Sequence, residues 1–448
     1  MSSFDAKKQR LIDEMKAAEG GVSLGKDTSN LFRDRKGAAQ KKLNVRDFHD
    51  VIGMNAEEQW VEVEGMTPYS ELVDWLLPHG FMPAVVPQLK SITIGGAVVG
   101  VGIEATSFRY GLVHETILEM EVLLPGGRVV VCTPTNEHKD LFYGLPNSYG
   151  TLGYILKLKA KIIPVKKYVR VTHEKFDDSA KFFNALEEAC HTARKEGIAD
   201  FIDGVIFSDR EMVLSRGRFT DEAPYAHDYT YMHIYYRTLQ KRKEDYLTTR
   251  DYIWRWDTDW FWCSKTFLVQ NPIVRFFVGR KRLNSVTYTK IMRWSARTGF
   301  GERLTKWRGV HAESVIQDLA MPIESCVEFL TFLLREIRVL PIWVCPSMPA
   351  DATAEYPLFH LDHTKLYVDF GFWDVVHTKE KHPAGFFNRK VEVEVEKLGG
   401  IKSLYSESFF PKEEFWKIYN KAQYDRLKKE YDPEGKLRDL YDKCVLKA

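Results

Sequence analysis

Three short segments with glycines or polar turn residues are spaced along the first third of the sequence. They are "GKDTSN" at residues 25–30, "PQLKSITIGGAVVGVGIEATSFRYG" at 87–111 and "GTLGYI" at 150–155. Main chain without Cβ atoms can approach an anion closely, and its exposed N–H groups suit a pyrophosphate. One such segment alone would favour tight packing around a glycine-kinked core strand. Three such segments, one after another along the chain, predict a dinucleotide-binding site.

The spacing of these glycines does not follow the GxGxxG pattern after a first strand, so a Rossmann site is disfavoured and a different dinucleotide-binding scheme is needed. A metal site is not predicted either. The six cysteines form no CxxC or CxxxC pair, which argues against both a zinc site and a disulfide framework. His360, Asp362 and His363 have a tempting spacing, but without a further ligand cluster they favour a polar loop.

Composition bounds the classes of function. The chain has 448 residues, more than one domain usually holds, and 64 basic against 62 acidic residues give a net charge of +2. Bulk charge therefore predicts no nucleic-acid partner. The charged N-terminus lacks the apolar core of a secretory signal, and no apolar stretch reaches the ~18 residues of a membrane span. We expect a cytoplasmic protein with reduced cysteines.

The elements that position the glycines follow from local patterns. We predict a helix over residues 6–19, strands near 22–25, 51–54 and 60–64, and a helix that starts at Thr67. Residues 117–132 predict a hairpin around Pro125, and an alternating strand follows Gly153. At about 165–172 the sequence changes to longer helical runs with many aromatic residues, and we place a domain boundary there. Beyond it we predict helices at 178–195, 236–256 and 322–338 and a helical C-terminus, while 391–397 fits either a strand or a helix.

Several of these stretches together resemble a known family. "VVPQLKSITIGGAVVGVGIEATSFRYGLVHETILEMEVLLPGGRVVVCTP" and "DLFYGLPNSYGTLGYILKLKAKIIPVKKYV" resemble the FAD-binding domain of vanillyl-alcohol-oxidase-like (PCMH-type) flavoproteins. Within that superfamily, "VIQDLAMPI", "KLYVDFGFW" and "LYSESFFPKEEFWKIYN" look most like the sterol side-chain (delta-24) reductases and their bacterial relatives. The resemblance covers most of the chain from about residue 22.

The resemblance implies an α+β fold in three parts. These are a PCMH-type FAD-binding domain of two α/β subdomains at 1–168, a mixed α/β substrate (cap) domain at 169–410, and a C-terminal helical segment at 411–448 that packs back on the FAD domain. It also implies which residues contact FAD: Gly25, Lys26, Thr28, Ser29, Asn30, Pro87, Leu89, Thr93, Ile94, Gly95, Gly96, Gly102, Ser107, Tyr110, Gly111, Gly150, Leu152, Gly153 and Ile155. Relatives that tether FAD use a histidine or cysteine at defined places. The first loop has no histidine, so we expect non-covalent FAD, with His114 as the residue that could contradict this.

The implied reaction is hydride transfer through flavin N5 to or from a carbon–carbon bond, together with proton transfer by a positioned acid. In strands that resemble the family's substrate region, the acid candidates are Tyr367 with Asp369 and Tyr405 with Glu407. Alternation would place each pair on one strand face. Asp257 and Asp259 could also be catalytic, although a role in holding nearby arginines is favoured.

The substrate and partners are less constrained. The sterol enzymes carry an N-terminal anchor for which this sequence shows no counterpart, so we expect a methylene- or methyl-branched acyl chain of a membrane phospholipid in a bacterium. The alternatives are a delta-24-sterol-type reductase, an FAD-dependent alcohol or hydroxy-acid oxidase or dehydrogenase, and a non-catalytic membrane-associated scaffold. NADPH would be a transient electron donor, and a redox partner is possible. The aromatic and basic stretch at 251–290 either docks peripherally on the inner face of a membrane or fills the core.

Overall fold

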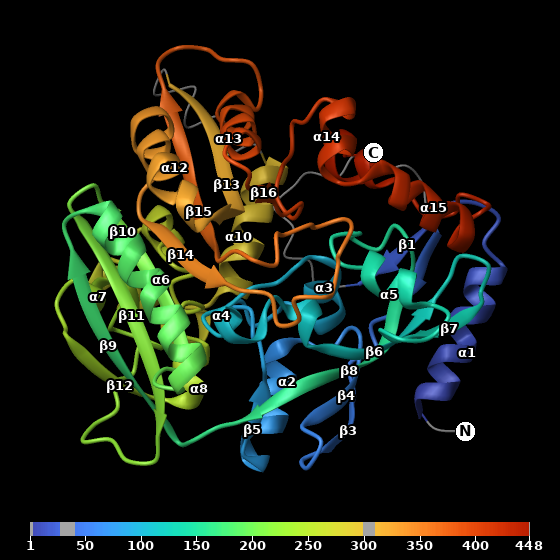
Figure 1. Ribbon diagram of the computed structural model, residues 1–448, viewed down its shortest axis with the longest axis horizontal. Coiled ribbons are helices and arrows are strands. Elements are labelled where there is room, and N and C mark those ends of the chain that lie inside the picture. Colours follow the sequence, from blue (N-terminus) through green and yellow to red (C-terminus); the bar gives the residue numbers. More distant parts are fainter. Residues whose placement is uncertain (1–2, 27–40, 299–309, 448) are drawn as a thin grey trace.

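The computed structural model describes residues 3–26, 41–298 and 310–447 (Figure 1). Strands in which apolar and polar residues alternate build its first sheet. Six strands form this sheet in the order β3-β4-β8-β6-β7, with β5 paired to β8. Its central strand β8 turns apolar side chains inward and lysines outward, which is the alternation that predicted it. The strands are β3 (Val51–Asn55), β4 (Trp60–Glu64), β5 (Phe81–Pro83), β6 (Ile117–Leu123), β7 (Val129–Cys132) and β8 (Tyr154–Pro164).

A two-stranded parallel sheet lies beside it, formed by β1 (Val22–Gly25) and β2 (Lys41–Asn44). The amphipathic helix α1 (Ser3–Lys16) buries Leu11 and Met15 and contacts β2. Both α1 and β1 agree with the sequence prediction. The backbone N–H of Val22 donates to the carbonyl of Lys436 at 3.1 Å, so the C-terminal segment closes on this small sheet.

The second large sheet has eight antiparallel strands in the order β12-β9-β11-β10-β14-β15-β13-β16. Helices α6, α12 and α13 cover one face of it (Figure 1). The strands are β9 (Tyr168–Phe176), β10 (Phe201–Ser208), β11 (Glu211–Thr220), β12 (Glu244–Thr248), β13 (His311–Pro322), β14 (Ile342–Ser347), β15 (Tyr367–Thr378) and β16 (Ile401–Lys402). The covering helices are α6 (Ser179–Glu196), α12 (Cys326–Phe332) and α13 (Phe386–Lys397).

Further helices and helical turns lie between the strands. They are α2 (Tyr69–Leu76), η1 (Leu77–His79), α3 (Ile94–Val99), α4 (Ser107–Tyr110), η2 (Val113–Thr116), α5 (Lys139–Gly144), α7 (Tyr235–Leu239), α8 (Thr249–Ile253), η3 (Cys263–Phe267), α9 (Pro272–Val278), η4 (Arg280–Arg282), α10 (Ser285–Thr298), η5 (Ile323–Ser325) and η6 (Leu333–Ile337). The chain ends with α14 (Lys412–Ile418), α15 (Lys421–Tyr431) and η7 (Asp442–Leu446). Helix α15 packs on α5, where Arg426 pairs with Asp140 at 2.6 Å.

The mixture of helices and antiparallel sheets confirms the α+β class, but two local predictions need correction, and the open alternative at 391–397 is decided. Residues 236–256 are not one helix: α7, β12 and α8 divide them, because Tyr246 and its neighbours pair with β9. Residues 391–397 belong to helix α13, whose Val391 and Val395 are buried four residues apart. The stretch "LYSESFF" at 404–410 is a loop after β16 rather than a strand. Within the described residues, no helix combines the length and apolar character needed to cross a bilayer.

Candidate functional site

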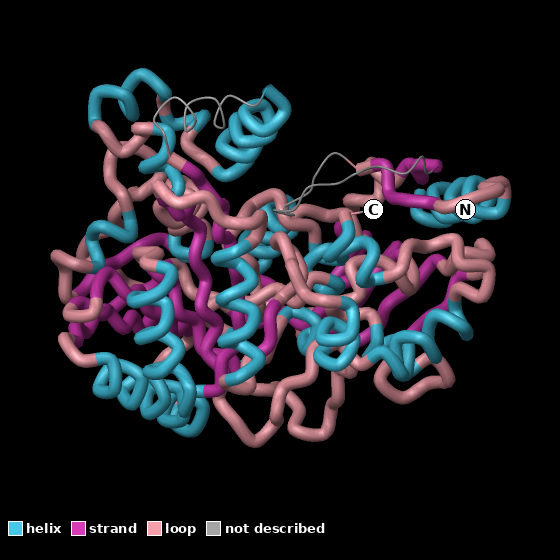
Figure 2. The backbone as a smooth tube through the Cα atoms, turned by 90° about the horizontal axis from the view of Figure 1, so that it is seen from above, coloured by secondary structure: helices cyan, strands magenta, loops and turns pink. Residues whose placement is uncertain are grey.

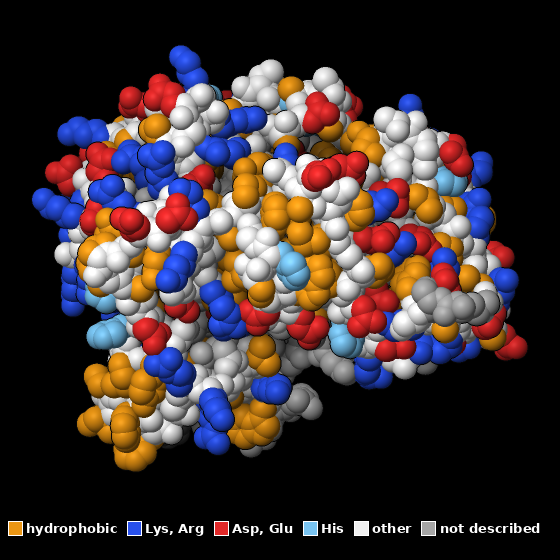
Figure 3. Space-filling view, turned by 90° about the horizontal axis from the view of Figure 1, so that it is seen from below, with side chains coloured by type: hydrophobic (Ala, Val, Ile, Leu, Met, Phe, Trp, Pro, Cys, Tyr) orange, Lys and Arg blue, Asp and Glu red, His pale blue; other side chains and the backbone are white. Residues whose placement is uncertain are grey.

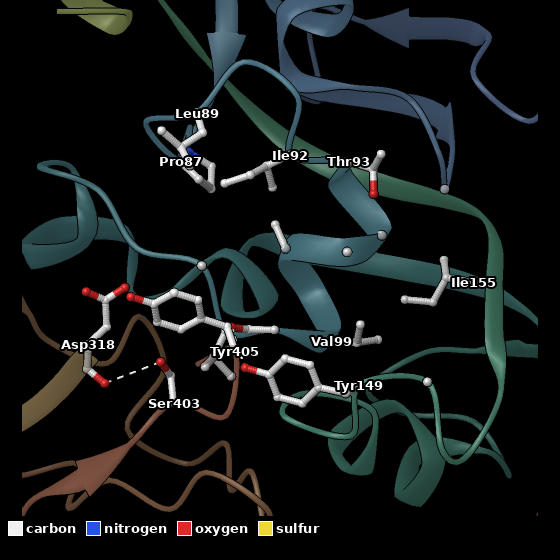
Figure 4. Close-up of a pocket in the computed structure, with 18 of the residues that line it drawn as sticks. Pro87, Leu89, Ile92, Thr93, Val99, Tyr149, Ile155, Asp318, Ser403 and Tyr405 are labelled. Carbon is white, nitrogen blue, oxygen red and sulfur yellow. Dashed lines mark hydrogen bonds between the residues drawn. The ribbon is translucent and has the colours of Figure 1, made fainter. Parts of the chain in front are cut away.

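A cavity of about 720 Å³ lies where the two large sheets and the small sheet meet. Figure 4 shows Thr93, Val99, Tyr149 and Ile155 on the side of the first sheet, facing Asp318, Ser403 and Tyr405 from the eight-stranded sheet and its loops. This volume lies within the range of small-molecule and cofactor sites.

Most of the predicted FAD contacts line this cavity. They are Gly25, Lys26, Pro87, Leu89, Thr93, Gly95, Gly96, Gly102, Gly150, Gly153 and Ile155. Three others, Thr28, Ser29 and Asn30, lie outside the described residues. The segments at 25–26, 87–102 and 150–155 are therefore brought together in space.

Five predicted contacts do not reach the cavity wall: Ile94, Ser107, Tyr110, Gly111 and Leu152. Ile94 and Leu152 are buried in the core, and the Ser107 hydroxyl accepts from the backbone N–H of Glu104 at 3.1 Å. Tyr110 lies under the ammonium of Lys161. Gly111 has φ +70°, and a Cβ there would lie 2.4 Å from the carboxyl carbon of Glu115. These positions shape the loops around the cavity.

The glycines permit close contact between segments of main chain. Gly95 N–H donates to the Gly65 carbonyl at 2.9 Å, and a Cβ on Gly95 would lie 2.6 Å from that oxygen. A Cβ on Gly65 would lie 2.2 Å from the carbonyl oxygen of Ile155. The end of β4, the start of α3 and the start of β8 therefore meet backbone to backbone. Sequence reasoning missed Gly65, although it directly follows the alternating strand "WVEVE".

Six basic side chains also line the cavity: Lys26, Lys42, Arg46, Arg438, Lys443 and Lys447. They come from the small sheet with the loop that follows it, and from the C-terminal segment. The Lys443 ammonium donates to the Tyr149 carbonyl at 2.6 Å, which ties the C-terminal segment to the Gly150 loop. Only Lys26 had been predicted, because the other five are far from the glycine segments in the sequence.

A pair of carboxyl groups lines the same cavity. Asp369 on β15 is buried, and Asp318 on β13 is enclosed by protein except where it borders the cavity. In the β13–β15 register, Asp318 stands opposite Gly371 and Asp369 opposite Ala320, so the two carboxylates are diagonal neighbours. Asp318 Oδ1 and Asp369 Oδ2 have no hydrogen-bond partner among the described residues.

Enclosure changes the protonation of this pair. Burial raises the pKa of Asp318 to about 7, and burial together with the nearby Asp318 charge raises the pKa of Asp369 well above its ordinary value. The Tyr405 hydroxyl lies next to Asp318, and burial raises the pKa of Tyr405, so this hydroxyl stays neutral. Figure 4 shows this hydroxyl pointing at the Asp318 carboxylate. The pair can therefore hold a proton at neutral pH.

The predicted catalytic residues divide accordingly. Tyr367, Asp369 and Tyr405 line the cavity, whereas Glu407 does not. Glu407 lies on a loop, where strand alternation does not apply, and its carboxylate accepts from the Lys447 ammonium. The Tyr367 hydroxyl accepts from the N–H of Asp362 at 3.0 Å, so it also holds the loop before β15. Asp318 was missed, although a lone carboxylate in the apolar strand "SVIQDLAM" was a usable signal.

Aromatic rings close the cavity beside these carboxyl groups. Phe261 stacks between Trp373, at a ring distance of 4.2 Å, and Trp256, at 4.8 Å. Trp260, Phe261, Phe359 and Trp373 line the wall. The tryptophans of 254–262 are buried, so for them the core hypothesis is correct and the membrane hypothesis is wrong. Asp259 binds Arg275 through both carboxylate oxygens, at 2.6 and 2.9 Å, which is the structural role that the sequence favoured.

His114 does not line the cavity. It is buried in η2 with its ring edge against Tyr356, and burial lowers its pKa to about 3. The cysteines also do not border the cavity. These positions agree with a cofactor held without a covalent bond. No cluster of three metal-ligating side chains occurs among the residues that the structure describes.

Comparison with known proteins gives a consistent result. The family described as "FAD binding domain" matches residues 22–133. The delta(24)-sterol reductase of Mus musculus is 29% identical over 416 residues, which cover 89% of this chain and 77% of the relative. That of Arabidopsis thaliana is 26% identical over 441 residues, 92% of this chain and 77% of the relative. Cytokinin dehydrogenase 7 of Oryza sativa subsp. japonica is 26% identical over 195 residues, 44% of this chain and 34% of the relative.

The cavity fits FAD, the cofactor named in the description of the matching family. The volume of about 720 Å³ suits a large planar cofactor, the main chain of Gly95, Gly96 and Gly150 borders it, and the six cations suit the diphosphate of a dinucleotide. Lys26, Lys42, Arg46 and Arg438 are the side chains that would hold that diphosphate.

Proposed function

Starting from an FAD-dependent oxidoreductase with a vanillyl-alcohol-oxidase-type FAD-binding domain, we propose that this protein reduces a carbon–carbon double bond in the apolar side chain of a lipid. The relatives named delta(24)-sterol reductase support a sterol-type side chain as the substrate. The expected phospholipid acyl chain has no support from these relatives. NADPH is the proposed electron donor.

When bound and reduced by NADPH, FAD would supply the hydride in this reaction. The protein supplies the proton: Asp318 is protonated up to a pH of about 7 because burial raises its pKa, and it faces the cavity. The neutral Tyr405 hydroxyl and Asp369 border the Asp318 carboxyl, and the charge of the pair favours a shared proton. One alkene carbon receives the hydride and the other receives the Asp318 proton, and the second product is the Asp318 carboxylate. Solvent then returns the proton.

The aromatic wall suits this chemistry. An isolated alkene becomes cation-like at its more substituted carbon as the proton arrives, and the faces of Trp260, Phe261 and Trp373 can stabilise that charge. The wall also favours a lipid over a hydroxy acid, because the arginines that line the cavity, Arg46 and Arg438, come from other elements. The observation that carries the proposal is the proton-holding carboxyl pair beside this apolar wall.

Anaerobic flavin spectroscopy tests the proposal. We expect NADPH to bleach the visible absorbance of the purified holoenzyme, and a detergent-dispersed sterol with a side-chain double bond to restore it with formation of the saturated product. A phospholipid with a branched unsaturated acyl chain and a hydroxy acid are the comparison substrates. If the phospholipid alone restores the colour, the sterol-type substrate is wrong. If only a hydroxy acid changes the flavin spectrum, by reducing it, the reductase proposal fails.

A further inference from the structure

A group of exposed hydrophobic side chains lies directly after η3 and on α9 and α10. Among the described residues, six large hydrophobic side chains are exposed by more than half, and five of them are here: Leu268, Ile273, Phe276, Phe277 and Trp294. We call these five residues the α9–α10 patch. Monomeric soluble proteins rarely expose such rings together without a partner. Figure 2 shows helices projecting from the body of the molecule, and Figure 3 shows hydrophobic side chains gathered at one projecting end.

The patch is held rigidly from below. Arg275 is buried on the inner side of α9, where its guanidinium binds Asp259 through two hydrogen bonds. The side chain of Asn271 caps the start of α9. On α10, the Tyr288 hydroxyl donates to the carbonyl of Thr258 at 2.8 Å. Phe276 and Phe277 are therefore exposed by a well-anchored helix rather than by local fraying.

The stretch of chain that carries the patch is basic, and acidic residues from other elements pair with three of its cations, Lys265, Arg275 and Arg280. Residues 260–301 contain eight lysines and arginines and no aspartate or glutamate. Lys281, Arg282 and Lys290 are exposed, and none forms an ion pair within the part of the chain that the structure describes. Exposed rings flanked by unpaired cations match the interface of an anionic bilayer, where rings lie at headgroup depth and cations meet phosphates.

We infer that the α9–α10 patch docks this protein on the surface of an anionic phospholipid bilayer. The same stretch of chain begins at Trp260 and Phe261, which line the cavity, so the docking helices follow directly from its aromatic wall. For a lipid-modifying enzyme this arrangement brings the site close to its substrate. That benefit depends on the proposed function, whereas binding itself does not.

Vesicle sedimentation of the purified holoenzyme tests the inference without measuring turnover. We expect binding to vesicles of phosphatidylcholine with phosphatidylglycerol, and much less binding to phosphatidylcholine alone or at high salt. Phe276→Ser with Phe277→Ser should lower the partition coefficient by at least tenfold. Lys281→Glu with Arg282→Glu should lower it by roughly fivefold or more per charge on anionic vesicles.

Ile198→Ser and Val393→Ser are matched controls, because both side chains are exposed elsewhere. They should bind vesicles like wild type. Thermal unfolding and flavin content confirm that every variant folds. The inference is wrong if wild type stays in solution with anionic vesicles, or if the double Phe variant binds as wild type does. It is also wrong if the patch instead mediates a dimer. In that case the Phe substitutions would convert a dimer to a monomer in solution and leave vesicle binding unchanged.

Discussion

Asp318 combines three properties that a proton donor to carbon requires. It faces the cavity, its Oδ1 has no hydrogen-bond partner among the described residues, and burial raises its pKa to about 7. General acids work best when their pKa lies near the working pH. Tyr405 and Asp369 border the same space, but Tyr405 is too weak an acid, because burial raises its pKa further.

Replacing the carboxyl of Asp318 should remove the proton without disturbing the shape of the site. We expect Asp318→Asn to lower the rate of flavin reoxidation by the lipid about 10²- to 10⁴-fold, the usual contribution of a general acid. Reduction of the flavin by NADPH should be unchanged. Glu407→Gln is the matched control and should behave as wild type, since Glu407 does not line the cavity. If the rate of flavin reoxidation falls equally in both variants, Asp318 is not the general acid.

The pH dependence follows from the direction of the pKa shift. The active form of Asp318 is the acid, and it exists below its raised pKa of about 7. The rate of flavin reoxidation by the substrate should therefore be high at acidic and neutral pH and fall as the pH rises through about 7. Stopped-flow spectroscopy across this range measures it. A rate that increases above pH 7 would require a carboxylate base instead.

The junction of β4, α3 and β8 leaves no space for a side chain at Gly95. A Cβ there would lie 2.6 Å from the carbonyl oxygen of Gly65. We expect Gly95→Ala to separate the three elements, to cost about 1–3 kcal/mol of stability and to lower the flavin content of the purified protein. Gly126→Ala is the control, because a Cβ at Gly126 meets nothing within 4 Å. Flavin absorbance per protein measures the flavin content, and thermal unfolding measures the stability. A Gly95→Ala protein with a full complement of flavin would contradict the predicted role of this close contact.

Strand β2 offers an adjacent pair of lysines that separates cofactor binding from general charge. Lys42 lines the cavity, whereas its neighbour Lys41 does not, because successive strand residues face opposite sides. We expect Lys42→Met to weaken FAD binding about tenfold, the loss of one charge-assisted contact, and Lys41→Met to have little effect. Titration of apoprotein with FAD at two salt concentrations measures both. If the Lys42→Met and Lys41→Met proteins bind FAD with equal affinity, Lys42 does not contact the diphosphate.

Sequence patterns predicted those elements whose signal is local. Helix α1 and strand β8 show their periodicity within one element, and the glycine segments could be placed along one cavity from their order and resemblance. The site at the eight-stranded sheet depends on contacts between distant residues. Asp318 and Asp369 are neighbours only because β13 pairs with β15, and Lys443 reaches the Gly150 loop from the chain end. The error at Glu407 arose from assuming a strand where β16 ends after two residues.

A buried ionic network joins the two large sheets next to the cavity. The Arg255 guanidinium donates to Glu104 at 2.7 Å and to Asp203 on β10 at 2.8 Å, and the Trp343 indole N–H donates to the same Asp203. Glu104 follows the cavity residues Gly102 and Ile103, so this network fixes the first sheet's loop against the eight-stranded sheet. Burial raises the pKa of Glu104, and the charge of Arg255 opposes that rise.

Removing Arg255 should therefore uncouple the two sheets. Arg255→Met leaves two buried carboxylates without a counter-charge, which costs about 3–5 kcal/mol at neutral pH. Because the folded pKa of Glu104 then rises further, folding takes up a proton, and the deficit should shrink as the pH falls below that pKa. The triple variant Glu104→Gln, Asp203→Asn, Arg255→Met should recover most of the stability. Urea unfolding at acidic and neutral pH measures all three proteins, and a single variant as stable as wild type at neutral pH would show that the sheets are held together by packing alone.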